Sequence, residues 1–203
     1  GYWMNNQFIN LSNCQSANAI YVFDGHVLVA GTGPGNGSQI FSEQAKYWID
    51  GNEIILGSFV YKSAANAIIL KGSDIYVAGY QYLSNLGYSV ATLWKNGVAS
   101  SLSTQPSWAY SVDVLNGNTY VSGEVKDLSN YNTMAAFWKN SQEFLLTSSA
   151  QDAAGNSIKV FGNDVYIAGY IDDNACYWKN GALTVLSKSN GSAIEWANSI
   201  VLK

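Results

Sequence analysis

Arginine is absent from this chain of 203 residues, and all ten of its basic residues are lysines. Proteins that read nucleic acids rely on arginine to contact phosphates and guanine edges. The formal net charge is −4 and the isoelectric point is about 4.8, and the basic residues form no run. We therefore expect no nucleic-acid partner and no attraction to an anionic membrane surface.

Histidine, cysteine and long apolar runs are also scarce. The single histidine, His26, follows the turn signal Asp24-Gly25, which leaves no Ser-His-Asp relay and no site with several histidine ligands. Cys14 and Cys176 are too few for a metal framework, and a disulfide or two separate thiols both stay open. No apolar run approaches the ~18 residues that a membrane helix needs, and the sequence shows no signal segment. We expect no metal, no cofactor and no membrane insertion.

A repeat dominates what is present, and three sequence patterns carry it. An aromatic residue or leucine precedes tryptophan at intervals of 40 to 46 residues, in Tyr2-Trp3, Tyr47-Trp48, Leu93-Trp94, Phe137-Trp138 and Tyr177-Trp178. An apolar run closes on glycine in Val27–Gly31, Ile75–Gly79, Thr119–Gly123 and Val165–Gly169. A small or polar pair precedes a β-branched residue at Ile20, Ile68, Val112, Ile158 and Ile200. Three patterns with one period indicate a repeat protein.

Each repeat is predicted to contain four strands, because β-branched and aromatic residues dominate and no helical period interrupts them. Residue pairs that suit two-residue hairpins separate the first strand from the second and the third from the fourth. These pairs are Asp24-Gly25, Gly72-Ser73, Asn116-Gly117, Gly162-Asn163, Asn5-Asn6, Asp50-Gly51, Asn96-Gly97, Asn140-Ser141 and Asn180-Gly181. The second strand is apolar on both faces, as in a sheet that is covered on both sides.

This period and strand count are typical of a β-propeller. We predict one all-β domain over residues 1–203, a five-bladed β-propeller of four-stranded antiparallel blades. The repeats are 1–16 (partial), 17–63, 64–107, 108–154, 155–195 and 196–203 (partial). The chain opens on a third strand and stops on a first strand, so we expect the C-terminal strand to close the ring against the N-terminal strands. That split blade lacks a second strand, which we expect an upstream segment to supply.

The order of strand, turn, Ile-Tyr-Val-Ala-Gly strand, loop and aromatic third strand resembles a Kelch-type repeat. The chain departs from that family where Tyr80 and Tyr170 replace the second glycine of a doublet, and in the position of its tryptophans. It is more similar to an uncharacterised repeat of secreted bacterial proteins, written Val-Tyr-Val-Ala-Gly-Tyr … Tyr-Trp-Lys-Asn-Gly. The resemblance implies a propeller fold and a secreted, periplasmic or cell-surface location, and it leaves the chemistry open.

Candidate binding residues lie on the face that carries the loops between second and third strands. These loops differ between repeats, at Thr32–Gln44, Gln81–Val90, Glu124–Met134 and Ile171–Asn174, and variable loops on a rigid scaffold usually hold binding residues. Aromatic residues at this face are expected either to stack on a sugar or to pack: Trp108, Trp196, Tyr80, Tyr82, Tyr88, Tyr131 and Tyr170. The five repeat tryptophans are interpreted as packing anchors.

Asparagines at the head of the innermost strands form a second set of candidates. They either line a channel mouth that binds water, an ion or a small polar ligand, or cap local backbone groups; they are Asn18, Asn66, Asn156 and Asn198. Asp172-Asp173-Asn174 lacks the spacing of a calcium loop and is interpreted as a solvated turn. Gly31–Gly35 lacks the lysine and helix of a phosphate loop.

The sequence favours a non-catalytic binding module for a glycan or protein, in a secreted or surface-exposed bacterial protein. A glycosidase- or lyase-type enzyme is the alternative, with Asp113 and Glu195 as channel carboxylates. A structural or assembly module, whose loop face docks a neighbouring domain, is the third.

Overall fold

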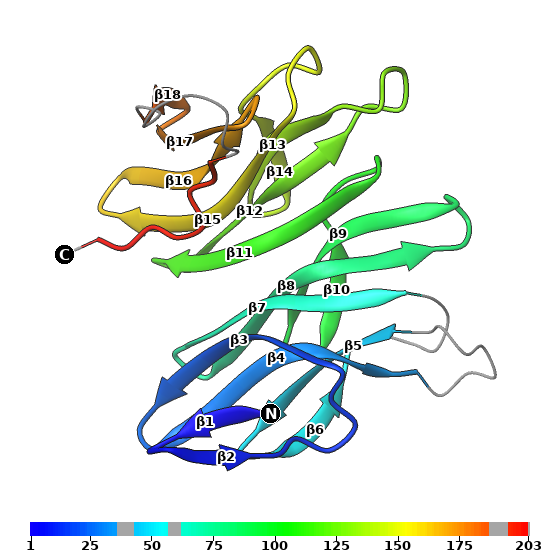
Figure 1. Cartoon of the computed structure of the whole chain (residues 1–203), viewed down its shortest axis with the longest axis vertical. Helices are drawn as coiled ribbons and strands as arrows, with labels where there is room; N and C mark the ends of the chain where they lie inside the picture. The colour runs from blue at the N-terminus through cyan, green and yellow to red at the C-terminus, as the bar shows by residue number, and fades with distance from the viewer. Residues whose placement is uncertain (36–42, 57–61, 187–194, 203) are drawn as a thin grey trace. The chain divides into compact units, whose positions relative to one another are not determined.

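The computed structural model describes residues 1–35, 43–56, 62–186 and 195–202, and all regular elements in these ranges are β-strands (Figure 1). They form four four-stranded antiparallel sheets and one two-stranded sheet. The predicted all-β class and the four-stranded repeat are therefore confirmed. By its internal contacts the chain divides into two compact units, Gly1–Ser101 and Leu102–Lys203. No helix in the described residues is long and apolar enough to cross a membrane.

The first unit contains three sheets. The short sheet pairs β1 (Tyr2–Met4) with β2 (Gln7–Ile9). Sheet 1 contains β3 (Ser16–Phe23), β4 (His26–Pro34), β5 (Glu43–Ile49) and β6 (Asn52–Ile55) in sequence order. Sheet 2 contains β7 (Ser63–Lys71), β8 (Asp74–Leu83), β9 (Tyr88–Lys95) and β10 (Val98–Ser101), again in sequence order.

The second unit contains two sheets of the same kind. Sheet 3 contains β11 (Ser107–Leu115), β12 (Asn118–Lys126), β13 (Thr133–Lys139) and β14 (Gln142–Leu145). Sheet 4 contains β15 (Ala153–Phe161), β16 (Asp164–Ile171), β17 (Asn174–Lys179) and β18 (Ala182–Val185). All four large sheets are meanders, so each strand pairs with the strand that follows it along the chain.

The nine predicted hairpin turns all adopt the expected backbone conformation. In seven, both residues have positive φ, as in type I′ turns; Asn96 and Gly97, for example, have φ of 50° and 82°. In Gly72-Ser73 and Gly162-Asn163 only the glycine has positive φ, as in type II′ turns. These turns connect strands with the right-handed twist that the sheets require.

A β-bulge interrupts each first strand opposite the glycine that closes the apolar run of the second strand. In sheet 2, Ala65 pairs with Gly79 and Ala67 with Ala78, which leaves Asn66 outside the ladder. A Cβ atom on Gly79 would lie 1.9 Å from the carbonyl oxygen of Ala64. The same close approach recurs at Gly31, Gly123 and Gly169. Glycine is therefore required there because a backbone oxygen occupies the place of a side chain.

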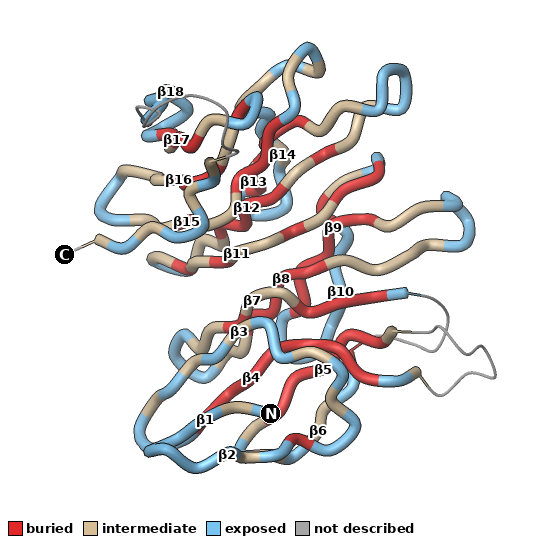
Figure 2. The backbone as a smooth tube through the Cα atoms, in the orientation of Figure 1, coloured by how far each residue is buried: buried red, intermediate tan, exposed pale blue. Residues whose placement is uncertain are grey.

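The hydrophobic core follows the second and third strands of each large sheet (Figure 2). Trp48, Trp94, Trp138 and Trp178 have no exposed surface, as expected of packing anchors. Leu28 and Tyr47 of sheet 1 pack with Ile68, Val77 and Trp94 of sheet 2 in one cluster of the first unit. In the second unit, Tyr120 of sheet 3 packs with Ile158, Ile167 and Trp178 of sheet 4.

The predicted closure by a C-terminal strand is not confirmed, because residues 195–202 form no strand. This segment nevertheless lies against sheet 4. The Ala197 backbone N–H donates to the Gly169 carbonyl at 3.1 Å, and the Ile200 N–H donates to Ser157 Oγ at 3.3 Å. The segment follows the sheet without joining a ladder.

Replacing Gly79 with alanine tests the bulge contact. We expect Gly79→Ala to lower the free energy of unfolding by about 3 kcal/mol, because backbone must move to admit the methyl group. Gly87→Ala is the matched control: Gly87 has φ of 81° and open space around it, so only the ~1–2 kcal/mol cost of the left-handed conformation applies. Urea unfolding followed by tryptophan fluorescence measures both. Equal losses would contradict the bulge contact.

Candidate functional site

Glu124 is the residue at which sheet 3 departs most clearly from the repeat. It follows Gly123 near the end of β12, at the position that Thr32, Tyr80 and Tyr170 occupy in the other sheets. Its Cα partners are Trp108 of β11 and Ala135 of β13. The sheet therefore surrounds this carboxyl with strands on both sides, and the residue is only partly exposed.

Burial raises the pKa of Glu124 to about 7, with a further increase from the negative charge of Asp152; a hydrogen bond with Tyr110 and the charge of Lys126 act in the opposite direction. A carboxyl with a pKa raised this far keeps its proton to a higher pH than an ordinary glutamate does. It can therefore both donate and accept hydrogen bonds.

Asp152, just before β15, is held by the neighbouring strands. Its Oδ1 accepts hydrogen bonds from the Thr133 N–H at 3.1 Å and from Thr133 Oγ1 at 2.5 Å. The Asp152 N–H donates to Asp172 Oδ1 at 3.1 Å, and the Asp172 N–H donates to the Asp152 carbonyl at 2.8 Å. The carboxylate is thus fixed in place at the start of β15.

An aromatic pair completes this part of the second unit. The rings of Tyr170 and Trp196 stack with centroids 5.3 Å apart and an interplanar angle of 28°, and Trp196 is 55% exposed. Burial raises the pKa of Tyr170, and the charges of Glu124 and Asp152 raise it further. The phenol and both carboxyls therefore share one electrostatic environment. We call Glu124, Asp152, Tyr170 and Trp196 the acidic-aromatic site.

Two of the predicted aromatic residues thus stack on each other, and two others of the second unit lie in β11 and in the loop between β12 and β13. Trp108 is not in a loop: it lies in β11, partly buried and opposite Glu124. Tyr131 lies in the loop between β12 and β13, where Lys126 Nζ is 5.4 Å from its ring centroid. The sequence prediction missed Glu124 and Asp152, although Glu124 is the one acidic residue to follow a repeat glycine.

Tyr80, Tyr82 and Tyr88 lie in strands of the first unit. The ladder between β8 and β9 continues to the pair Leu83–Tyr88, so most of the predicted loop 81–90 is strand. Burial raises the pKa of Tyr80, which fits a packing role. Of the predicted loop 32–44, residues 36–42 lie outside the described residues.

Two of the four predicted asparagines contact neighbouring backbone. Asn18 and Asn156 are bulge residues, and their amides donate to neighbouring backbone, Asn18 Nδ2 to the Ala65 carbonyl at 2.9 Å and Asn156 Nδ2 to the Ala197 carbonyl at 3.2 Å. Asn66 occupies the equivalent bulge of β7, and Asn198 is exposed. The contacts of Asn18 and Asn156 are those expected of the capping alternative.

Of the two predicted channel carboxylates, Asp113 makes hydrogen bonds to two strands. Asp113 accepts the backbone N–H of Val114 and that of Val160, each at 2.9 Å, and so joins β11 to β15. The Glu195 N–H donates to the Asp173 carbonyl at 3.1 Å. Both cysteines are free thiols, and burial raises the pKa of Cys176 to about 12. Within the described ranges no three histidine, cysteine or acidic residues cluster as metal ligands.

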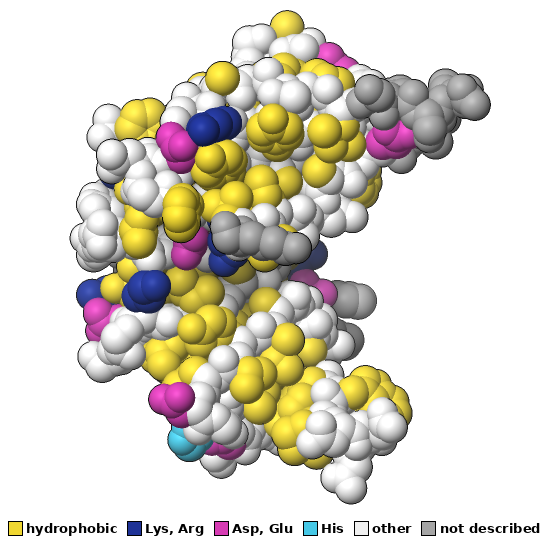
Figure 3. Space-filling model, turned by 90° about the vertical axis from the view of Figure 1, so that its left-hand side faces the viewer, with side chains coloured by type: hydrophobic (Ala, Val, Ile, Leu, Met, Phe, Trp, Pro, Cys, Tyr) yellow, Lys and Arg dark blue, Asp and Glu magenta, His cyan; other side chains and the backbone are white. Residues whose placement is uncertain are grey.

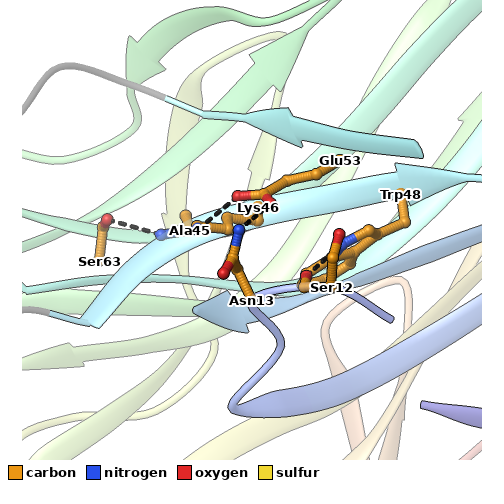
Figure 4. Close-up of polar contacts among 7 residues, drawn as sticks. All are labelled: Ser12, Asn13, Ala45, Lys46, Trp48, Glu53 and Ser63. Atoms are coloured by element: carbon orange, nitrogen blue, oxygen red, sulfur yellow. Dashed lines mark hydrogen bonds and ion pairs between the residues drawn. The ribbon is translucent and has the colours of Figure 1, made fainter. Parts of the chain in front are cut away.

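A second polar cluster lies in sheet 1, around Lys46 (Figure 4). Lys46 Nζ contacts Glu53 Oε1 at 2.5 Å, and Asn13 Nδ2 donates to Glu53 Oε2 at 2.8 Å. The Lys46 side chain is 2% exposed, and Gly33 leaves room for its carbon chain, since a Cβ there would lie 2.9 Å from Lys46 Cδ. Burial acts to raise the pKa of Glu53, but hydrogen bonds from Lys46 and Asn13 bring it below its usual value.

This cluster borders an open pocket of about 340 Å³, lined by Asn13, Pro34, Gly35, Lys46, Glu53 and Ile55. Thr92, Ala136 and Cys176 take the position of Lys46 in the other large sheets. Because the lysine and the glutamate neutralise each other, the pocket presents no net charge from this pair. The Lys46–Glu53 pair joins β5 to β6, the last strand of sheet 1, and we interpret it as stabilising that edge of the sheet.

Breaking the pair tests that role. We expect Lys46→Met to lower the free energy of unfolding by about 3 kcal/mol, because Glu53 is left largely buried without its cation. The control is Lys46→Met combined with Glu53→Leu, which removes both charges and should recover most of the loss. Chemical unfolding measures both variants, and an equal loss in the two would contradict the interpretation.

Glu124 gives a second prediction, on pH dependence. A carboxyl whose pKa rises from 4.5 to about 7 on folding contributes stability that is fully present below about pH 4.5 and is lost as the pH rises through 7. We expect the stability of the natural chain relative to Glu124→Gln to fall between pH 5 and pH 8. Urea unfolding at several pH values measures this, and a constant difference would contradict the raised pKa.

Comparison with known proteins identifies no family. No protein-family model matches the chain, and no curated protein matches it. Among solved structures, the chain is similar to an acylaminoacyl peptidase of Pyrococcus horikoshii, with a TM-score of 0.47 and 16% identity over 88% of this chain. The match covers 32% of the peptidase chain. A similarity at this level leaves activity and substrate undetermined.

Proposed function

We propose that the chain is a non-catalytic binding module that takes a neutral carbohydrate at the acidic-aromatic site. The observation that carries this proposal is the exposed Trp196 ring, stacked on Tyr170, with Glu124 and Asp152 acting on the same tyrosine. Stacking on the half-buried Tyr170 restricts the orientation of the tryptophan, so less side-chain entropy is lost when a ligand covers it.

The chemistry of the site fits a sugar. A pyranose offers an apolar C–H face to an aromatic ring, and its hydroxyl groups donate hydrogen bonds to carboxylate oxygens. Glu124, whose raised pKa favours the protonated form, can also donate to a ring or hydroxyl oxygen. The Asp152 N–H donates to the Asp172 carboxylate, and Asp173 follows Asp172 in the sequence. This group of acidic residues would repel an acidic polysaccharide.

The site is expected to be single. In the other large sheets, the position equivalent to Glu124 is occupied by Thr32, Tyr80 and Tyr170. A lectin with one site per repeat would carry similar residues in each. One asymmetric site on a repeated scaffold fits a single ligand segment better.

We propose in addition that the sheets are blades of a Kelch-like five-bladed propeller, in a protein secreted or displayed on a bacterial surface. The 40- to 46-residue period and the turn pattern support the propeller. The resemblance to repeats of secreted bacterial proteins supports the location. A glycan at the cell surface or in the medium would then be the natural ligand.

A glycan array followed by calorimetry tests the binding proposal. We expect a neutral oligosaccharide to bind, and Trp196→Ala to weaken its binding about tenfold, the effect of losing an aromatic contact worth about 1.4 kcal/mol. Trp3→Ala is the control, because Trp3 is also exposed but lies in the other unit. Equal weakening in both variants, or no glycan bound at all, would contradict the proposal.

An enzyme of glycosidase type is the second candidate, favoured by one observation. A carboxyl with a pKa of about 7 that interacts with a second carboxyl resembles the acid and base of such enzymes. Incubating the bound oligosaccharide with the protein and examining the products separates the two. Hydrolysis that is lost in Glu124→Gln would identify the enzyme, and intact oligosaccharide would leave the binding module.

A further inference from the structure

The short sheet differs from the other four in the exposure of its tryptophan. Trp3 is 71% exposed, whereas the equivalent tryptophans of the four large sheets have no exposed surface. In those sheets each tryptophan pairs with valine or isoleucine of a second strand: Trp48 with Val29, Trp94 with Val77, Trp138 with Val121 and Trp178 with Ile167. β1 pairs with β2 alone in the described residues, so one edge of β1 lacks a partner strand.

The face of the neighbouring strand β3 lacks a cover as well. Ile20 is 53% exposed, whereas its equivalents Ile68 and Ile158 are 4% and 0% exposed. Leu28 and Ala30, from the second strand of sheet 1, pack in one cluster with Ile68. Tyr120, from the second strand of sheet 3, packs in the same way with Ile158. A second strand beside β1 is the element that would cover Ile20.

The turn of the short sheet provides a third sign of the same strand. In the large sheets the first turn residue accepts the backbone N–H that opens the second strand, from Val27, Ile75, Thr119 and Val165 to Asp50, Asn96, Asn140 and Asn180, at 2.8 to 2.9 Å. Asn5 takes the same place in the short sheet, with the same left-handed backbone, φ 47° against 49° to 51°. Asn5 therefore carries, at the same place, a side-chain oxygen that can accept such an N–H.

We call the free edge of β1 together with the exposed face of β3 the acceptor surface. We propose that this surface accepts an added β-strand. One antiparallel strand would pair with β1, bury Trp3, cover Ile20 and donate an N–H to Asn5. Trp3, Ile20 and Val22 are exposed hydrophobic residues of β1 and β3. In Figure 3, hydrophobic side chains are visible on the part of the first unit that carries the histidine. Burial of such apolar side chains favours association.

The repeat itself defines the occupant. It is an extended peptide of β-branched residue, leucine or tyrosine, valine or isoleucine, alanine or serine, and glycine, the pattern of Val27–Gly31, Ile75–Gly79, Thr119–Gly123 and Val165–Gly169. A folded second copy of this chain cannot supply it, because β4, β8, β12 and β16 are each paired on both sides. The partner is therefore an unpaired strand of this composition.

A synthetic peptide tests the acceptor surface in the full chain. The probe has the sequence of residues 164–170, Asp-Val-Tyr-Ile-Ala-Gly-Tyr, with lysines added at both ends for solubility. We expect binding by calorimetry, a blue shift of tryptophan fluorescence as Trp3 is buried, and slower hydrogen exchange in β1. A peptide with proline in place of the isoleucine should not bind, because proline lacks the N–H that the ladder needs.

Two variants of one turn make the test specific. Asn5→Gly removes the acceptor but tolerates positive φ, and we expect about fivefold weaker peptide binding, the effect of one hydrogen bond. Asn6→Gly is the matched control, since glycine stands at this place in most of the other turns, and it should bind as the natural chain does. Ile20→Asp should weaken binding at least tenfold by placing a charge under the strand.

The proposal is overturned if the peptide fails to bind, or if the proline peptide binds equally well. It is also overturned if sedimentation shows that copies of the chain associate through this surface and Ile20→Asp separates them, because a second copy would then be the occupant.

Discussion

The close contact between a bulged first strand and a glycine of the second strand is the constraint on which each large sheet depends. At Gly31, Gly79, Gly123 and Gly169 a backbone oxygen occupies the space of a Cβ atom. The bulge also turns one residue out of the ladder, and in β3 and β15 that residue is an asparagine that binds neighbouring backbone. One local irregularity therefore shapes the sheet and links it to its neighbour within the unit.

Function is assigned to positions where the repeat changes. The glycines, the turn residues and the four buried tryptophans perform the same task in each large sheet, so they explain the scaffold. Glu124 and Lys46 replace uncharged residues at equivalent positions of the other large sheets. The exposed Trp3 shows the reverse change, a constant residue whose partner strand is missing from the described residues.

Local features of the fold could be predicted from the sequence, and features that depend on register could not. Turns such as Asn96-Gly97 depend on the φ angles of two residues, so their conformation follows from residue type. The use of Asn18 depends on a bulge, and the extension of β8 and β9 through Tyr82 and Tyr88 depends on pairing across the hairpin. The acidic-aromatic site joins residues up to 72 positions apart, from Glu124 to Trp196, and only the placement of residues 195–202 against sheet 4 brings them together.

The central claim is that the constant positions of the repeat build the scaffold and that ligand binding occurs where the repeat changes. The seven indole N–H signals of the chain report on both classes of position in a single nuclear magnetic resonance titration with the bound oligosaccharide. The account predicts that the Trp196 signal shifts with ligand concentration, while those of Trp48, Trp94, Trp138 and Trp178 stay in place. Shifts of comparable size at the four buried indoles, with Trp196 unchanged, would contradict it.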